Sequence, residues 1–193
     1  MNTQPLLQEK VKVFGLIGGI ASGKSTVQKV FADEDYQVIE LSDTLKKKLK
    51  EMGIDNPKRI DYATCAETLR EEFGKAALAL LSVNNISEDG KVVISGIRTP
   101  EEVEYLRERF SDLVLIGIDV PLEVRIERVR SRLRSIDPMS EEAILKEIDR
   151  EWNGGENGCQ LGSTITLCDI FINGNTSINN MQAECRAVAF RDN

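Results

Sequence analysis

The sequence contains no histidine. This absence excludes a histidine general base, a cysteine–histidine dyad and a histidine-ligated zinc ion. Proton transfer by this chain must therefore use a carboxylate or water. The four cysteines form no C-x-x-C pair, so we expect reduced, mostly buried thiols of a cytoplasmic protein rather than a disulfide framework.

Long hydrophobic runs are also absent, so the sequence offers no candidate for a bilayer-spanning helix. The polar opening MNTQP does not have the pattern of a signal peptide. The net charge of −7 argues against nucleic acid or an anionic membrane as the main partner. With 193 residues, the chain is long enough for one well-packed domain and short for two, and we predict a single domain over 1–193.

One glycine-rich segment carries the strongest functional signal. Residues 18–26 read GGIASGKST and directly follow the apolar run VKVFGLI at 11–17. They match the phosphate-binding loop G-x-x-x-x-G-K-[ST]. Apolar residues then recur at helical spacing, so the motif has the strand before it and the helix after it that it requires. A glycine-rich turn that binds nothing is the weaker interpretation.

Each fixed position of this loop has a physical role. Gly18 and Gly23 let the backbone turn tightly and bring its N–H groups against phosphate oxygens. Lys24 would reach the outer phosphates of the nucleotide as a point charge. The Ser25 hydroxyl would bind the Mg²⁺ ion that accompanies the nucleotide.

Strands alternate with helices along the rest of the chain, which predicts a parallel sheet covered on both faces. We expect strands at 11–17, 37–41, 91–95, 113–118 and 169–173. Ser42 is expected to cap the helix after the second strand, and one longer helical region is expected over 62–83. Thr99 to Glu102 has the pattern of a capping box. In such folds, ligands bind at the carboxyl ends of the strands.

Three arginines repeat at helical spacing after the fourth strand. Arg125, Arg128 and Arg132 would form a stripe beside the apolar face of their helix. Beside a phosphate loop, such a stripe supplies cations to the charge that develops in phosphoryl transfer. The alternative is a solvated face paired with Glu123 and Glu127.

Two further candidates follow the second and third strands. Asp43 would orient the hydroxyl of a phosphoryl acceptor or help to hold Mg²⁺, and the alternative is a first-turn aspartate that complements the helix dipole. Arg98 is placed to meet an anionic substrate, and the alternative is a surface ion pair with Glu101 or Glu102. Ser95 stands where many phosphate-loop proteins have an aspartate that supports Mg²⁺.

These motifs carry a resemblance to known kinases. The segment GLIGGIASGKSTV at 15–27 resembles the opening of dephospho-coenzyme A kinases. The chain over about 11–180 resembles more closely a group of small archaeal P-loop kinases and the kinase-like domain of some deoxycytidylate deaminases. The matching segments are LREEFG at 69–74, SGIRTPEEV at 95–103, the R-x-R-x-x-D-P pattern at 132–138 and DIFIN at 169–173.

The resemblance implies the fold of nucleoside monophosphate kinases, an α/β three-layer P-loop sandwich with a five-stranded parallel sheet and a small helical lid. The lid would span about 132–158, and its arginines Arg132 and Arg134 would close over the phosphates. Arg70 and Arg98 would contact the acceptor, and the turn at 173–175 would lie near adenine. The residues expected to bind ATP are Gly18, Gly19, Ala21, Ser22, Gly23, Lys24, Ser25, Thr26, Arg128, Asn173 and Gly174.

The function implied is transfer of the γ-phosphoryl group of ATP, with Mg²⁺, to a small nucleotide-like acceptor. That acceptor would be a nucleoside or deoxynucleoside monophosphate, or dephospho-coenzyme A. Lys24, Asp43, Arg132 and Arg134 are the expected catalytic residues. Ser95 in place of aspartate motivates the alternative, an ATP-binding sensor or pseudokinase.

Overall fold

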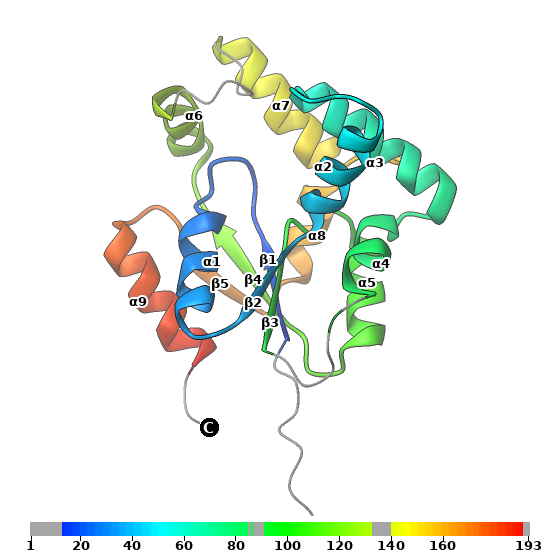
Figure 1. Ribbon diagram of the computed structural model, residues 1–193. Coiled ribbons are helices and arrows are strands. Elements are labelled where there is room, and N and C mark those ends of the chain that lie inside the picture. The colour runs from blue at the N-terminus through cyan, green and yellow to red at the C-terminus, as the bar shows by residue number, and fades with distance from the viewer. Residues whose placement is uncertain (1–12, 85, 87–90, 133–139, 191–193) are drawn as a thin grey trace, which may run out of the picture.

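In the computed structural model, which describes residues 13–84, 86, 91–132 and 140–190, five parallel strands form one sheet (Figure 1). The strand order is β2-β3-β1-β4-β5, so the strand that leads into the phosphate loop lies in the centre. The strands are β1 (Val13–Ile17), β2 (Gln37–Glu40), β3 (Val92–Ser95), β4 (Val114–Asp119) and β5 (Ile170–Asn173). The predicted parallel sheet is confirmed, with strand ends that shift by one or two residues.

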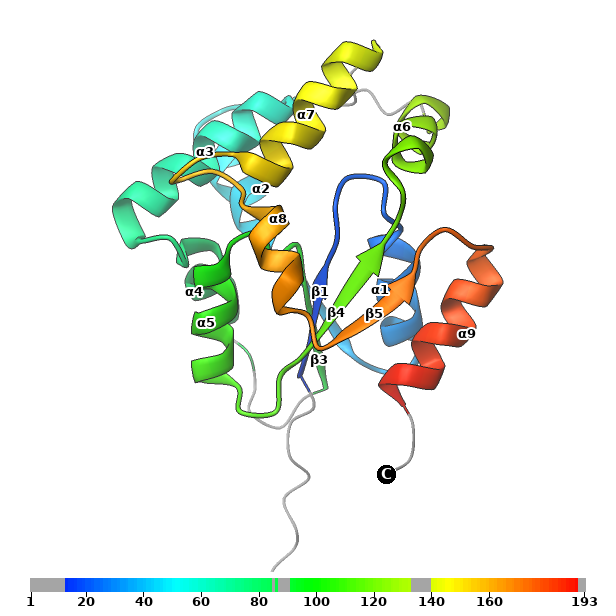
Figure 2. The ribbon, with the colours of Figure 1, turned by 180° about the vertical axis from the view of Figure 1, so that it is seen from behind.

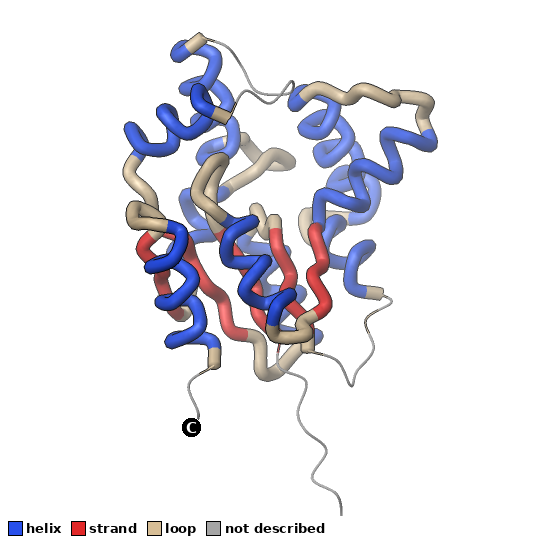
Figure 3. The backbone as a smooth tube through the Cα atoms, turned by 60° about the vertical axis from the view of Figure 1, so that its left-hand side comes forward, coloured by secondary structure: helices blue, strands red, loops and turns tan. Residues whose placement is uncertain are grey.

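Helices cover both faces of this sheet (Figures 1 and 2). α1 (Lys24–Asp33) and α9 (Ile178–Ala189) pack together on one face. α4 (Ala77–Val83), α5 (Pro100–Arg109) and the short α8 (Leu161–Thr164) lie on the other. The remaining helices stand beyond the carboxyl ends of the strands (Figure 3): α2 (Leu41–Glu51), α3 (Arg59–Phe73), α6 (Leu122–Ser131) and α7 (Glu141–Asn153).

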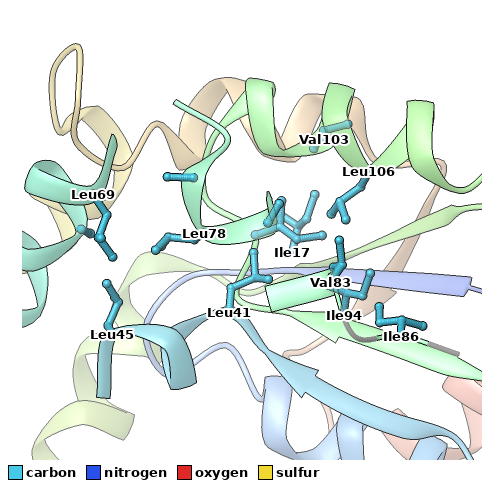
Figure 4. Close-up of a cluster of buried hydrophobic side chains, with 14 of the residues drawn as sticks. Ile17, Leu41, Leu45, Leu69, Leu78, Val83, Ile86, Ile94, Val103 and Leu106 are labelled. Atoms are coloured by element: carbon cyan, nitrogen blue, oxygen red, sulfur yellow. The ribbon is translucent and has the colours of Figure 1, made fainter. Parts of the chain in front are cut away.

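Alternating side chains of the central strand build the two main hydrophobic clusters. Val13 and Ile17 belong to the cluster on the side of α4 and α5 (Figure 4), whereas Phe14 and Leu16 belong to the cluster under α1 and α9. Because successive side chains of a strand point to opposite faces, an apolar strand buried on both sides is the pattern of a central parallel strand.

Three local features differ from the sequence-based expectations. The region predicted as one helix over 62–83 is two helices, α3 and α4, because Gly74 ends α3 with a φ of 87° that interrupts helical geometry. Ser42 does not cap α2, which begins at Leu41 with Glu40 as its N-cap. The sequence reading also missed α8 and the 3₁₀ turn that follows it (Ile165–Leu167). The capping box of Thr99 and Glu102 is confirmed.

The four cysteines are free thiols, of which Cys65 and Cys185 are buried. Burial raises the pKa of the Cys185 thiol to about 12, so this thiol stays protonated at neutral pH. Among the described residues, no helix has both the length and the apolar character that crossing a membrane requires.

A buried ion pair joins α3 to the start of α5. Nη2 of Arg70 lies 3.2 Å from Oε1 of Glu102, and both side chains are at most 1% exposed. Glu102 also accepts hydrogen bonds from the backbone N–H groups of Arg98 and Thr99. Burial raises the pKa of the Glu102 carboxyl, against the opposing effect of Arg70. The pair therefore fixes the segment that follows β3.

Replacing Glu102 with glutamine should destabilise the protein by about 3–5 kcal/mol, because Arg70 would become an unpaired buried cation. Urea denaturation measures this loss. Glu101→Gln is the matched control, since the neighbouring Glu101 forms a partly exposed pair with Lys75 and should cost at most about 1 kcal/mol. Equal losses in the two variants would contradict the role assigned to the buried pair.

Candidate functional site

The phosphate loop connects β1 to α1 at the centre of the sheet. Ala21 and Gly23 both have positive φ, 59° and 101°, and the N–H of Ser22 donates to the carbonyl of Gly19 over 3.2 Å. These conformations turn the backbone back on itself, so that its N–H groups converge with those that open α1. The first turn of α1 contains no acidic residue, which leaves the positive end of its dipole available to an anion.

Lys24 lies across the mouth of this loop. Its Nζ donates to the carbonyl of Gly18 over 2.5 Å and to that of Gly19 over 3.1 Å. Burial lowers the pKa of Lys24 well below its ordinary value, and Arg98, Arg125 and Arg132 lower it further. The charges of Arg98, after β3, and of Arg125 and Arg132, from α6 and its end, therefore act on the lysine of the motif. Their roles in binding or catalysis stay predictions.

The carboxylate nearest to this site at the end of β2 is Glu40, which the sequence reading overlooked. It accepts hydrogen bonds from Nε2 of Gln28 on α1 and, over 3.2 Å, from the hydroxyl of Ser42. Its charge raises the pKa of Lys24, against the larger effect of burial. A signal was present in the sequence, because a lone acidic residue that ends a strand at the ligand-binding edge is a candidate in its own right.

Glu40 also lies beside Ser95, the serine at the end of β3. In the sheet, Glu40 pairs in register with Ser95, and Ser95 pairs with Leu16 just before the phosphate loop. Ser95 is fully buried, and its hydroxyl makes no hydrogen bond with the described part of the chain. The carboxylate that β3 lacks is thus present one strand away, at the matching position of β2.

Asp43, the other carboxylate near the end of β2, lies in an exposed setting. It lies on α2 with a side chain that is 63% exposed, and its carboxylate pairs with Lys46 over 2.6 Å. This arrangement is the first-turn aspartate that was the alternative interpretation. The catalytic role of Asp43 stays a prediction, and the geometry favours Glu40 for it.

The arginine stripe is not a solvated face. Arg125 is 6% exposed and packs directly on Gly19, where an added Cβ would lie 2.8 Å from Nη1 of Arg125. Burial lowers the pKa of Arg125. Arg128 donates to the carbonyls of Ala21 (3.3 Å) and Gly174 (2.7 Å). It therefore ties the phosphate loop to the turn after β5, two segments that were predicted to bind ATP.

Arg98 forms neither of the two side-chain pairs that the sequence suggested. Its guanidinium pairs with Glu151 of α7, while only its backbone N–H reaches Glu102, over 2.7 Å. Oε2 of Glu151 in turn accepts a hydrogen bond of 2.6 Å from the N–H of Ile20 in the phosphate loop. Glu151 was not singled out from the sequence, because its helix was read only for its apolar face.

The remaining predicted residues are dispersed. Arg70 is buried against Glu102 and the carbonyl of Asn157, and its role toward an acceptor stays a prediction. Asn173 is exposed, and its side chain accepts from the N–H of Asn175 in the turn after β5. Arg134 lies outside the described residues.

The loop offers oxygen ligands of the kind that Mg²⁺ prefers. Ser25 is exposed at the start of α1, and Gln28, one turn further on, holds the Glu40 carboxylate on the same side. In the described part of the chain, no group of three or more acidic, histidine or cysteine side chains forms a metal site by itself. These residues fit an ion that arrives with a nucleotide and keeps water ligands.

The sequence profile of a family described as an AAA domain matches residues 15–146. A UPF0200 protein of Methanoculleus marisnigri is 31% identical to this chain, over 94% of this chain and 97% of that protein. The chain belongs to both of these families. A UPF0200 protein of Pyrococcus horikoshii is similar too, at 32% identity over 90% of this chain and 93% of its own.

Solved kinases share the fold of this UPF0200 chain. The shikimate kinase of Aquifex aeolicus covers 93% of the chain, with 99% of its own length matched, at a TM-score of 0.53 and 20% identity. A gluconokinase of Sinorhizobium meliloti covers 93%, with 92% of its own length matched, at a TM-score of 0.56 and 16% identity. At these identities the likeness shows a P-loop kinase-like fold and leaves the acceptor open.

Arg128→Met should destabilise the protein by about 1–3 kcal/mol, because two charge-assisted hydrogen bonds to loop carbonyls are lost. Thermal or urea unfolding gives the measurement. Arg130→Met on the same helix is the control: Arg130 forms an exposed pair with Glu141, whose loss should cost less than about 1 kcal/mol. If the control loses as much stability, Arg128 does not hold the loop.

Proposed function

We propose that the protein is a P-loop phosphotransferase that moves the γ-phosphoryl group of ATP to a small nucleotide-like acceptor. The observation that carries the proposal is the packing of arginines around the phosphate loop. Arg125 lies against Gly19, and Arg128 donates to the carbonyl of Ala21. Arg98 is linked to the loop through Glu151, which accepts from the N–H of Ile20. In a chain of net charge −7, such a local concentration of cations suits a polyanion. Phosphoryl transfer needs little covalent chemistry from a protein, and positioning plus charge stabilisation supply most of the catalysis.

Each part of the site has a role in this proposal. The loop N–H groups and the N-terminus of α1 bind the nucleotide phosphates, and Lys24 reaches the transferred group once it leaves the carbonyls of Gly18 and Gly19. Ser25 and Glu40 would hold the Mg²⁺ that accompanies ATP, which supplies charge neutralisation on the phosphates. Arg132 and Arg134 are proposed to act from the lid, and the turn at 173–175 is proposed to lie beside adenine.

The acceptor would lie at the carboxyl ends of β2 and β3. Glu40 ends β2, and Arg98 follows β3, so this edge offers a carboxylate for an acceptor hydroxyl and a cation for an anionic group. The acceptor classes proposed are nucleoside or deoxynucleoside monophosphates and dephospho-coenzyme A. Kinases that share the fold are named for shikimate and gluconate, so small hydroxylated acids belong in an acceptor screen.

A second candidate function is an ATP-binding sensor with little or no turnover. It is favoured by Ser95, whose buried hydroxyl stands where an aspartate would support Mg²⁺. ADP production measured over the acceptor panel separates the two functions. Tight ATP binding without acceptor-dependent ADP would favour the sensor, and a gain of activity in Ser95→Asp would support a decayed kinase.

Lys24→Ala should lower acceptor-dependent ADP production by about 10²-fold or more and leave the protein folded, because the lysine stabilises charge on the transferred group. A coupled ADP assay and circular dichroism make the two measurements. Lys29→Ala is the control, since Lys29 is exposed on the same helix and should leave the rate unchanged. Wild-type turnover in Lys24→Ala would contradict the role assigned to Lys24 in phosphoryl transfer.

The two carboxylates near the end of β2 can be distinguished by isosteric replacement. We expect Glu40→Gln to lower kcat by about 10²-fold, the scale of a lost general base or metal ligand. Asp43→Asn should change kcat little, because Asp43 is exposed and paired with Lys46. A larger loss in Asp43→Asn, from the same ADP assay, would return the catalytic role to Asp43.

A further inference from the structure

Glu151 reaches the phosphate loop from the far end of α7. Its Oε2 accepts the 2.6 Å hydrogen bond from Ile20 N–H and lies 4.0 Å from Nη2 of Arg125, while Oε1 accepts from Arg98. The side chain is only 11% exposed. An added Cβ on Gly19 would lie 2.9 Å from Oε2, so the carboxylate lies directly against the loop backbone.

Packing of α7 explains why this carboxylate is at the loop. Ile144 and Ile148 form a small hydrophobic cluster with Ile20 of the loop and Val129 of α6. Glu151 follows Ile144 by seven residues and Ile148 by three, so it lies on the same face of the helix. The cluster thus docks α7 onto the loop and delivers Glu151 to the Ile20 N–H.

The three groups around Glu151 are those that a phosphoryl group would use. A loop N–H and two guanidinium groups are strong donors to phosphate oxygens. Arg125 is buried, and its Nε and Nη2 make no hydrogen bond with the described residues, so this cation is not saturated by the chain. The carboxylate of Glu151 therefore lies at a loop N–H and two guanidinium groups that could equally bind a phosphoryl group.

On the proposed function, the two arms of the loop bind different phosphates of the nucleotide. The N–H groups that open α1 cradle the inner phosphates of a nucleotide, and Lys24 reaches from there to the outer ones. Ile20 lies on the opposite arm of the loop, and Glu151 links its N–H to Arg98, which follows β3. On the proposed function, the terminal phosphoryl group of a triphosphate extends to this second arm, whereas the β-phosphate of a diphosphate ends in the cradle.

We propose that Glu151 is a specificity-determining residue whose carboxylate occupies the place of the terminal phosphoryl group, so that ATP, but not ADP, must displace it. This inference rests on the proposed function. Displacement would separate Glu151 from Ile20 and free both Arg98 and Arg125 for the transferred group. After transfer, the carboxylate returns to the same donors, which favours the diphosphate-bound form of the loop.

The test is calorimetric titration of the full chain with Mg²⁺–ADP and with the non-hydrolysable triphosphate Mg²⁺–AMP-PNP. Glu151→Gln keeps the shape of the side chain and removes its charge. It should tighten AMP-PNP binding by about tenfold, the scale of one charge-assisted hydrogen bond, and leave ADP binding within about twofold. Glu147→Gln is the matched control on α7, because Glu147 pairs with Arg150 over 3.2 Å and should alter neither affinity.

Unchanged or weaker AMP-PNP binding in Glu151→Gln would overturn the inference, and so would equal tightening of both nucleotides. Hydrogen exchange of the wild-type protein gives a second readout that does not depend on the variant. Backbone amides in 141–153 should exchange faster with AMP-PNP than with ADP, and equal exchange would overturn the displacement of Glu151. A wild-type protein that binds neither nucleotide would instead overturn the proposed function, and the inference with it.

Discussion

The site is governed by the need to balance several cations around one loop. Lys24, Arg98 and Arg125 come from three segments, and burial lowers the pKa of both Lys24 and Arg125. Buried cations are costly unless anions face them, and the fold supplies two, Glu40 from the edge strand β2 and Glu151 from α7. Hydrophobic packing holds α2 and α7 above the sheet, and in these positions Glu40, just before α2, and Glu151, on α7, face the cations.

Much of this architecture was readable in the sequence because its signals are local. The loop motif, the capping box at Thr99 and the apolar strands depend on neighbouring residues, and all three are confirmed. Gly74 shows the limit of such signals: the apolar pattern continues across it, and only its φ of 87° separates α3 from α4. The small α8 offered no amphipathic pattern long enough to recognise.

The partners within the site could not be predicted in the same way. Glu151 is 131 residues from Ile20 along the chain, and Arg98 is 53 residues from Glu151, so only the packed fold brings them together. Choosing between Glu40 and Asp43 likewise required knowing which way the first turn of α2 faces. Arg70 was assigned from the resemblance alone, and its buried pair with Glu102 joins segments 32 residues apart, which no local pattern reveals.

The central place of β1 has a consequence for how the polypeptide is made. Val13 pairs with Val92 on one side, and Phe14 pairs with Val114 on the other, so the first strand has no neighbour until about half of the chain has been synthesised. Contacts between such distant segments slow folding and leave apolar surface open in the meantime. The phosphate-loop segment therefore acquires its final shape only after β3 and β4 have been made, and the apolar strand before it stays unpaired until then.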